Sequence, residues 1–325
     1  MPDAITVALA GDTMLGRSVA ERLAAGTPPS SLIAPSVAEA MGAADLAIVN
    51  LECCISDRGT PWTARSKSFF FRAPPVAVDV LRWLGVDAVT LANNHALDYG
   101  FDALLDTRRL LEAAGIAVVG AGADAAEARQ PLVLEAGELR VGVIGITDHP
   151  KDFAATPTRP GVAYADLDDG VPGWLLDLVR ATREKCDVLL VTPHWGPNMT
   201  AEPRPPIRSA ATALVEGGAT FVAGHSARVF HGVAGRVLFD LGDFLDDYAV
   251  DPILRNDLGL LWLVTLDAHG PIRADALPLL LEYCHTRLAG PDDSARVEHR
   301  LRQACADLGG PAVSREGLHL VMRWR

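Results

Sequence analysis

The sequence predicts a layered α/β fold, and three observations support this prediction. Short apolar, β-branched runs recur along the chain and end in Gly, Asp, Asn or His. Stretches of helical length lie between these runs, and several are followed by a glycine, where helices commonly end. Polar residues gather at the strand ends, which in a fold of alternating strands and helices meet at one edge of the sheet.

In chain order, the runs expected as buried strands are Ile5–Ala10, Leu46–Val49, Ala88–Leu91, Val141–Ile146, Val188–Val191, Phe221–Ala223 and Val237–Leu241. The stretches expected as helices between them are Ser18–Ala25, Val76–Leu84, Phe101–Ala114, Trp174–Lys185 and Ile207–Glu216. Gly85, Gly115 and Gly217 follow three of these helices. Helix therefore separates strand from strand along most of the chain, as a layered sheet requires.

The length and composition fit a compact globular protein. A chain of 325 residues allows one large domain or two ordinary ones. A hydrophobic fraction of 49% with 22% charged residues supports a sizeable core. We expect one domain over residues 1–289, extended by a helix and a strand over the arginine-rich residues 290–325.

Charge and cysteine content limit the partners and the compartment. Lys and Arg total 29 against 41 for Asp and Glu, and the resulting net charge of −12 disfavours nucleic-acid binding, which needs a basic face. The five cysteines are scattered without a Cys-x-x-Cys pair, which suits reduced thiols. The N-terminus lacks the basic region of a signal peptide, and no apolar run approaches the roughly 20 residues that span a bilayer. We therefore expect a soluble cytoplasmic protein without a membrane partner.

Six polar side chains follow the expected strands closely, and they are the first candidates for a functional site: Asp12, Glu52, Asn94, His95, His194 and His225. Each has an ordinary explanation by itself, because Asp caps helices, Asn forms turns and a lone His is more often structural than a ligand. Together they are expected to converge on one sheet edge, where α/β proteins bind ligands.

The motifs around these residues resemble those of the CapA-type family of capsule, or poly-γ-glutamate, synthesis proteins. The matching segments, between about residues 4 and 265, are GDTMLGR (11–17), NLECCISDRG (50–59), LANNHALDYG (91–100), TPHWGPN (192–198), AGHSARV (223–229) and DLGDFLDDY (240–248). This family looks like a branch of the calcineurin-like metallophosphoesterases. The resemblance implies an α/β fold in which a two-sheet sandwich is flanked by helices and a metal site lies at the strand ends.

The resemblance also implies metal ligands. Asp12, Glu52 and Asn94 match the first aspartate, the second acidic ligand and the Asn of an Asn-His pair. Two histidines expected by the family pattern are absent, because Met14 and Arg228 stand in their places. The remaining ligands are rich in oxygen, so we expect one divalent hard cation, with Ca²⁺ favoured over Mn²⁺, Mg²⁺ and Zn²⁺.

Histidines that do not bind metal become candidates for proton transfer. An unperturbed histidine titrates near neutrality, so we expect His95, His194 and His225 to be able to transfer protons, with carboxylates to orient them. Asp98 follows His95 in a His-Ala-Leu-Asp spacing and is the most suggestive partner. The alternative is that Asp98 satisfies amide donors at a helix N-terminus while His95 only packs.

Two further residues are expected to contact the substrate. Arg228 could clamp a carboxylate or phosphate through its planar guanidinium, or could form a surface salt bridge with Asp246–Asp247. Trp195 directly follows His194 and could line the pocket.

These features leave more than one function open. A branch similar to CapA includes lasso-peptide epimerases, so the first hypothesis is epimerisation at the Cα of a C-terminal residue of a peptide substrate, by His/Asp pairs near the cation. The alternative is hydrolysis of a phosphoester or of a γ-glutamyl amide in capsule metabolism. A silent scaffold in a polymer-export assembly is the third possibility.

Overall fold

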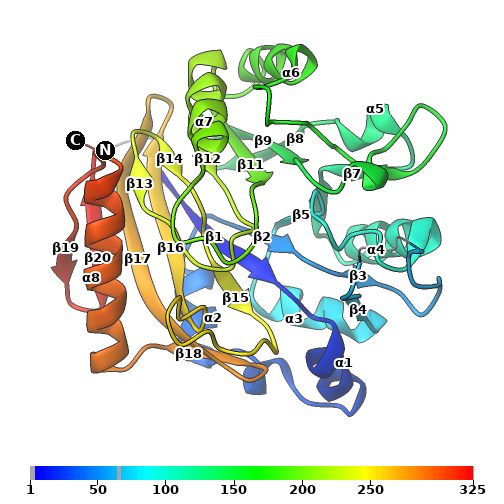
Figure 1. The fold of residues 1–325 in the computed structure, drawn as a ribbon, viewed down its shortest axis with the longest axis horizontal. Coiled ribbons are helices and arrows are strands. Elements are labelled where there is room, and N and C mark those ends of the chain that lie inside the picture. Colours follow the sequence, from blue (N-terminus) through cyan, green and yellow to red (C-terminus); the bar gives the residue numbers. More distant parts are fainter. Residues whose placement is uncertain (1–3, 64–66, 325) are drawn as a thin grey trace.

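Two β-sheets packed face to face form the centre of the protein, as a computed structural model describing residues 4–63 and 67–324 shows (Figure 1). The expected α/β sandwich is thus confirmed. The larger sheet has the strand order β19-β20-β17-β16-β1-β2-β5-β6, and β15 and β18 pair with β1 and β17. Its strands are β1 (Ile5–Thr13), β2 (Leu46–Leu51), β5 (Ala88–Thr90), β6 (Ala117–Val119), β15 (Asp243–Leu245), β16 (Leu258–Asp267), β17 (Gly270–Glu282), β18 (His285–Leu288), β19 (Ser314–Glu316) and β20 (His319–Arg323).

The second sheet has the order β13-β14-β12-β11-β9-β8. Its strands are β8 (Leu132–Ala136), β9 (Leu139–Thr147), β11 (Val188–His194), β12 (Phe221–Ala223), β13 (Val233–Ala234) and β14 (Val237–Leu238). Two small ribbons lie outside the sandwich and pair β3 (Cys54–Ile55) with β4 (Arg72–Ala73), and β7 (Ala121–Gly122) with β10 (Gly161–Val162).

Helices cover the sandwich: α1 (Arg17–Ala24), α2 (Pro35–Gly42), α3 (Val78–Trp83), α4 (Gly100–Ala113), α5 (Ala125–Ala128), α6 (Gly173–Arg183), α7 (Pro205–Gly217) and α8 (Pro291–Asp307). Short 3-10 helices occur at Pro29–Ser31, Pro75–Ala77 and Lys151–Phe153. No helix within the described residues combines the length and the apolar character needed to cross a membrane.

Residue alternation along the strands explains the layers. In β1, Val7 and Leu9 point into the core between the sheets, while Ala8 and Ala10 pack on the opposite face beneath α1–α4. The second sheet buries its outer face against α6 and α7. Strands buried on both faces read as continuous apolar runs, which is why these segments stand out in the sequence.

The C-terminal residues 290–324 add a helix and two strands to the same sandwich. Helix α8 contributes Val297, Leu301 and Cys305 to the core between the sheets and lies along one side of the sandwich (Figure 1). Strand β20 then pairs antiparallel with β17.

Strand direction determines where the polar residues lie. Strands β1, β2, β5 and β6 run parallel, as do β9, β11, β12 and β14 in the second sheet. The carboxyl ends of parallel strands share one edge. The segments that carry the six candidate side chains therefore end on a common rim of the sandwich.

Candidate metal centre

The first sheet places an aspartate at the rim. Asp12 lies near the end of β1, opposite Asn50 of β2 in the parallel ladder and opposite Asp243 of β15. A bulge in β1 between Ala10 and Asp12 shifts this register. Such bulges re-aim side chains at strand ends, and here the Asp12 side chain is buried with 1% of its surface exposed.

The second sheet supplies two histidines. His194 is the last residue of β11. His225 follows β12 and forms an isolated parallel β-bridge to His194. Their Nδ1 atoms lie 2.8 Å apart, and each lies 3.8 Å from Oδ1 of Asp12. Asp12 and His225 are thus neighbours although 213 positions separate them in the sequence. We call Asp12, His194 and His225 the metal triad, because their ligand atoms all lie within 4.8 Å of one another.

Neighbouring polar groups orient the triad. Asn50 donates from its side-chain nitrogen to Oδ1 of Asp12 at 2.6 Å. The hydroxyl of Thr192 lies 3.0 Å from Nε2 of His225, which leaves Nδ1 of that ring for the centre. Hydrogen bonds to the far side of a ligand are typical of metal sites, because they fix ring orientation and tautomer.

The chemistry of the triad fits a divalent cation. Oδ2 of Asp12 and Nε2 of His194 are buried and have no hydrogen-bond partner among the described residues. Burial lowers the pKa of His194 below its usual value and the pKa of His225 to about 3, so both imidazoles are neutral, the form that binds metals. Burial, with help from Glu52, raises the pKa of Asp12, so this carboxylate needs a nearby positive charge to stay ionised.

The structure brings only part of the expected oxygen-rich ligand set to the metal triad. Glu52 follows β2, but its Oε2 accepts a hydrogen bond from the Tyr248 hydroxyl at 3.3 Å and its Oε1 lies 3.9 Å from Nε2 of His95. Oδ1 of Asn94 is buried without a partner in the described chain and stays a candidate ligand. With two imidazoles beside Asp12, the donor set suits a transition metal better than Ca²⁺, so the preference for calcium finds no support.

His95 and Asp98 form the expected pair. Nδ1 of His95 lies 2.6 Å from Oδ2 of Asp98, and Oδ1 of Asp98 lies 2.7 Å from Nζ of Lys67. Asp98 does not cap a helix, since α4 starts at Gly100 with no side-chain cap. The imidazole also stacks on Phe71 at 3.8 Å, so it both packs and hydrogen-bonds. Burial lowers the pKa of His95, which keeps the ring neutral.

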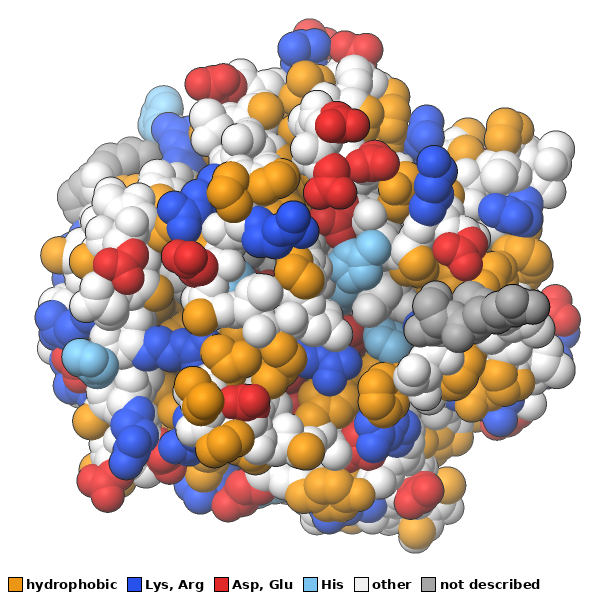
Figure 2. Space-filling model, viewed as in Figure 1, with side chains coloured by type: hydrophobic (Ala, Val, Ile, Leu, Met, Phe, Trp, Pro, Cys, Tyr) orange, Lys and Arg blue, Asp and Glu red, His pale blue; other side chains and the backbone are white. Residues whose placement is uncertain are grey.

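A cavity of about 240 Å³ opens beside this pair, with polar and aromatic walls. Its lining residues include Trp62, Lys67, Asn94, His95, His149 and Arg228. Histidine side chains are visible in a hollow near the middle of this face (Figure 2). A second cavity, of about 480 Å³, shares Asn94, His149 and Asn198 with the first and has acidic walls.

A second His/Asp pair borders both cavities. Nδ1 of His149 contacts Oδ1 of Asp148, and the carboxylate accepts a further hydrogen bond from the Gly196 amide at 2.9 Å. The ring centroids of His149 and His194 lie 5.2 Å apart. The sequence analysis singled out neither His149 nor Lys67, although Asp148-His149 directly follows an expected strand, as the chosen residues do.

The structure places Arg228 in the wall of the cavity and Trp195 in the hydrophobic core. The Arg228 guanidinium lies over the Tyr248 ring at 3.9 Å and lines the cavity, while Asp247 pairs with Arg17 at 3.4 Å. The expectation for Trp195 is wrong: it is 3% exposed, donates to the Phe239 carbonyl at 2.8 Å and belongs to the core beneath α6 and α7. Side chains alternate along an extended segment, so the residue after His194 faces away from the site.

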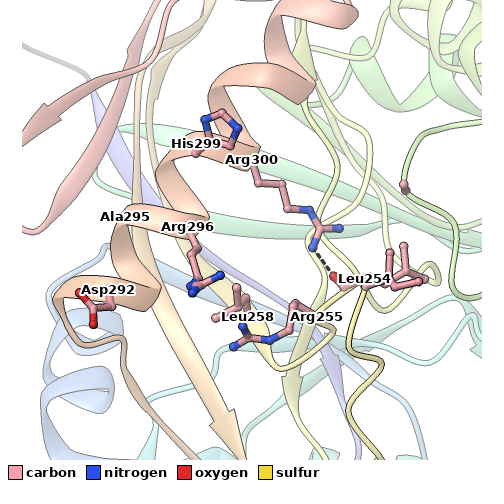
Figure 3. Close-up of a pocket in the computed structure, with 10 residues that line it drawn as sticks. Leu254, Arg255, Leu258, Asp292, Ala295, Arg296, His299 and Arg300 are labelled. Carbon is pink, nitrogen blue, oxygen red and sulfur yellow. Dashed lines mark hydrogen bonds between the residues drawn. The ribbon is translucent and has the colours of Figure 1, made fainter.

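A larger cavity, about 720 Å³, lies elsewhere, between α8 and the segment before β16 (Figure 3). Three arginines line it, and Arg300 donates to the Leu254 carbonyl at 2.7 Å. Neither the metal triad nor its neighbours His95 and His149 line this cavity. Size alone therefore does not locate the functional site, and the ligand chemistry at the strand ends does.

Comparisons with known proteins show which family the chain belongs to. A family model described as bacterial capsule synthesis protein PGA_cap matches residues 6–248. A probable polyglutamine synthesis accessory protein of Mycobacterium tuberculosis is 30% identical over 97% of this chain and 94% of its own length. The PGA biosynthesis protein CapA of Bacillus subtilis is 26% identical over 85% of this chain and 76% of its own. A solved phosphatase structure from Mycoplasma pneumoniae is 13% identical, covers 90% of this chain and 97% of its own, and has a TM-score of 0.49.

The family match covers most of the segment in which the sequence motifs were found, including all three residues of the metal triad. A buried aspartate with two neutral histidines is the donor set of a metal-dependent enzyme. The chain belongs to the bacterial capsule synthesis protein family PGA_cap, the CapA type.

Proposed function

We propose that the protein is a metal-dependent hydrolase that acts on an anionic substrate, a phosphoester or a γ-glutamyl amide. One observation carries this proposal: a cavity lined by the carboxylate-held His95 and by Lys67 and Arg228 also has His149 in its wall, and the ring centroid of His149 lies 5.2 Å from that of His194 in the metal triad. The γ-glutamyl alternative draws on the names of relatives, which concern polyglutamate synthesis.

The chain's own groups can position and protonate such a substrate. A divalent cation held by the metal triad would polarise the scissile carbonyl or phosphoryl oxygen and activate water. Asp98 fixes Nδ1 of His95, which leaves the unprotonated Nε2 of that ring to take a proton from the attacking water and then pass it to the leaving group. The guanidinium of Arg228 suits a carboxylate or phosphate oxygen pair.

The test uses the full chain stripped of metal with a chelator and reloaded with Mn²⁺ or Zn²⁺. Hydrolysis of an aryl phosphate and of a γ-glutamyl anilide is then measured. We expect one of the two to be cleaved, with activity lost on chelation. H95Q should lower kcat by about 10²- to 10⁴-fold, whereas R255M, which changes an arginine outside the site, should leave it unchanged. Absence of cleavage of both probes with either metal would contradict the proposal.

A second candidate is epimerisation of a peptide residue, and a specific observation favours keeping it. Two-base epimerisation needs a proton-transfer group on each face of the Cα atom. His95 with Asp98 and His149 with Asp148 both border the same cavity. In this reaction Arg228 would hold the terminal carboxylate of the peptide.

Deuterium exchange separates the two candidates. In D₂O, an epimerase incorporates deuterium at the Cα of its peptide, and H149Q should block exchange from one starting configuration more than from the other. A hydrolase gives cleaved product without Cα exchange. Peptides encoded beside this gene are the substrates to use, and lack of exchange in all of them removes epimerisation.

A further inference from the structure

Three buried carboxylates, one of them that of Asp12, lie at the rim of the sandwich. Asp12, Glu52 and Asp243 are each 1% exposed. Asp243 lies opposite Asp12 in the β1–β15 ladder, and neither of its carboxylate oxygens has a hydrogen-bond partner in the part of the chain that the structure describes. Carboxylates this deeply buried need positive charge close by to remain ionised.

The metal triad provides ligands for one cation. Among the described residues, Asp12, His194 and His225 form the single group of three His, Cys, Asp or Glu ligand atoms close enough to share an ion. Met14, two residues after Asp12, is fully buried, and its Sδ accepts a hydrogen bond from the Gly16 amide at 3.0 Å. The end of β1 therefore offers no histidine for a second ion beside Asp12, and the carboxylates of Glu52 and Asp243 are the groups left to bind one.

Arg228 lies among these carboxylates. It follows His225 by three residues on the same loop, in the left-handed backbone region with φ of 62°. Its guanidinium lies on the ring of Tyr248, whose hydroxyl donates to Glu52. Its Nε atom is buried with no partner in residues 4–63 and 67–324. Arg228 also lines the cavity that His95 lines, and Nε2 of His95 lies 3.9 Å from Oε1 of Glu52.

We propose that the guanidinium of Arg228 supplies the second positive charge of this centre, so that the centre binds one divalent cation rather than two. This inference rests on the proposed function, because it gives Arg228 a part in the proposed hydrolysis. In two-metal hydrolases the ions, about 3.5–4 Å apart, clamp the attacking and leaving oxygens. Here a fixed, always ionised side chain takes over charge stabilisation at one of the two positions and holds an anionic group of the substrate through paired N–H donors.

This arrangement has a consequence for substrate choice. A guanidinium binds oxygen anions but neither dehydrates nor polarises them as a metal ion does. The substrate class that fits is one whose carboxylate or phosphate oxygens reach both the bound ion and Arg228. Neutral esters and amides without such an anionic group should be poor substrates.

Metal stoichiometry tests the inference without reference to activity. Metal-free protein is titrated with Mn²⁺, and bound ions per chain are counted by mass spectrometry while electron paramagnetic resonance reports coupled ion pairs. We expect the wild type to bind one ion tightly and to show no coupled pair. R228M removes the positive charge and keeps a side chain of similar size. The affinity for a second ion should therefore be higher in R228M than in the wild type, on the order of tenfold or more.

Two variants serve as controls. R228K keeps the charge and should behave as the wild type, and R255M removes an arginine that pairs with Asp257 outside the site. Two tightly bound ions in the wild type, or a single ion in folded R228M, would overturn the inference. If R228M does not fold, the wild-type count still decides. Hydrolysis by wild-type protein is a separate measurement, so failure of the proposed function and failure of this inference are distinguishable.

Discussion

The ion pair between Lys67 and Asp98 should be strongly coupled, and its strength can be worked from the structure. Nζ of Lys67 lies 2.7 Å from Oδ1 of Asp98, with side chains that are 13% and 0% exposed. At an effective dielectric constant of about 20, Coulomb's law gives about 6 kcal/mol of attraction at this separation. Desolvation opposes it, so we expect a coupling free energy of about 2–4 kcal/mol from a double-mutant cycle.

The cycle uses K67M, D98N and the double variant, with the free energy of unfolding measured by urea denaturation at pH 8.5. The control is the exposed pair Arg140–Asp187, with side chains 53% and 32% exposed, for which R140M and D187N should couple by less than about 1 kcal/mol. Equal coupling in both cycles, or less than about 0.5 kcal/mol for Lys67 and Asp98, would refute the reasoning.

The same pair has a pH signature. Burial, opposed by Lys67, raises the pKa of Asp98 from its usual 3.8 to about 7. Because the folded-state pKa is raised, the stability that this carboxyl contributes is fully present below about pH 4 and is lost as the pH rises through 7. The coupling needs the ionised form, so it should be present at pH 8.5 and nearly absent at pH 5.5.

Four further outcomes are expected. H225A should lose tight Mn²⁺ binding in calorimetry while its circular dichroism spectrum stays that of the wild type; retained binding would argue against the metal triad. Metal at 100 times its dissociation constant should stabilise the wild type by about 2.7 kcal/mol, and a thermal shift that H225A shares would point to another site. Burial lowers the pKa of His231 to about 4. Its contribution to the free energy of unfolding is therefore fully present above pH 6.5 and falls by up to about 3 kcal/mol as the pH drops to 4. H231Q should flatten this part of the stability profile, which is measured by denaturation at a series of pH values. F71A removes the fully buried ring stacked on His95 and should cost about 3–5 kcal/mol in urea denaturation, and a cost under 1 kcal/mol would mean the cavity collapses.

The central parallel strands could be predicted because the chain buries them on both faces. β1, β2 and β11 appear in the sequence as uninterrupted apolar runs, and polar residues mark their carboxyl ends. The long antiparallel strands β16 and β17 were not assigned. Both lie inside the larger sheet, but their place there depends on pairing with β1 and β20, which no local pattern encodes.

The roles within the site were harder to predict than its members. Sequence motifs brought together Asp12, His194 and His225, but spacing along the chain cannot show that two imidazoles meet the same carboxylate. His149 was not singled out, because a lone histidine is more often structural than functional. Only the proximity of its ring to His194 distinguishes it, and that distance arises from the packing of β9 against β11.

The metal triad draws its ligands from both sheets, which ties the site to the core between them. Asp12 comes from β1, whereas His194 and His225 lie at the ends of strands in the second sheet. Their separation is therefore set by side chains packed between the sheets, such as Val7 and Leu190, and by the bulge that turns Asp12 inward. Interiors at crystal-like packing density transmit small displacements, so changes in this core should alter metal affinity even where they touch no ligand. An enzyme built in this way can gain or lose a ligand on one rim loop, as at position 228, without disturbing the strands that hold the others.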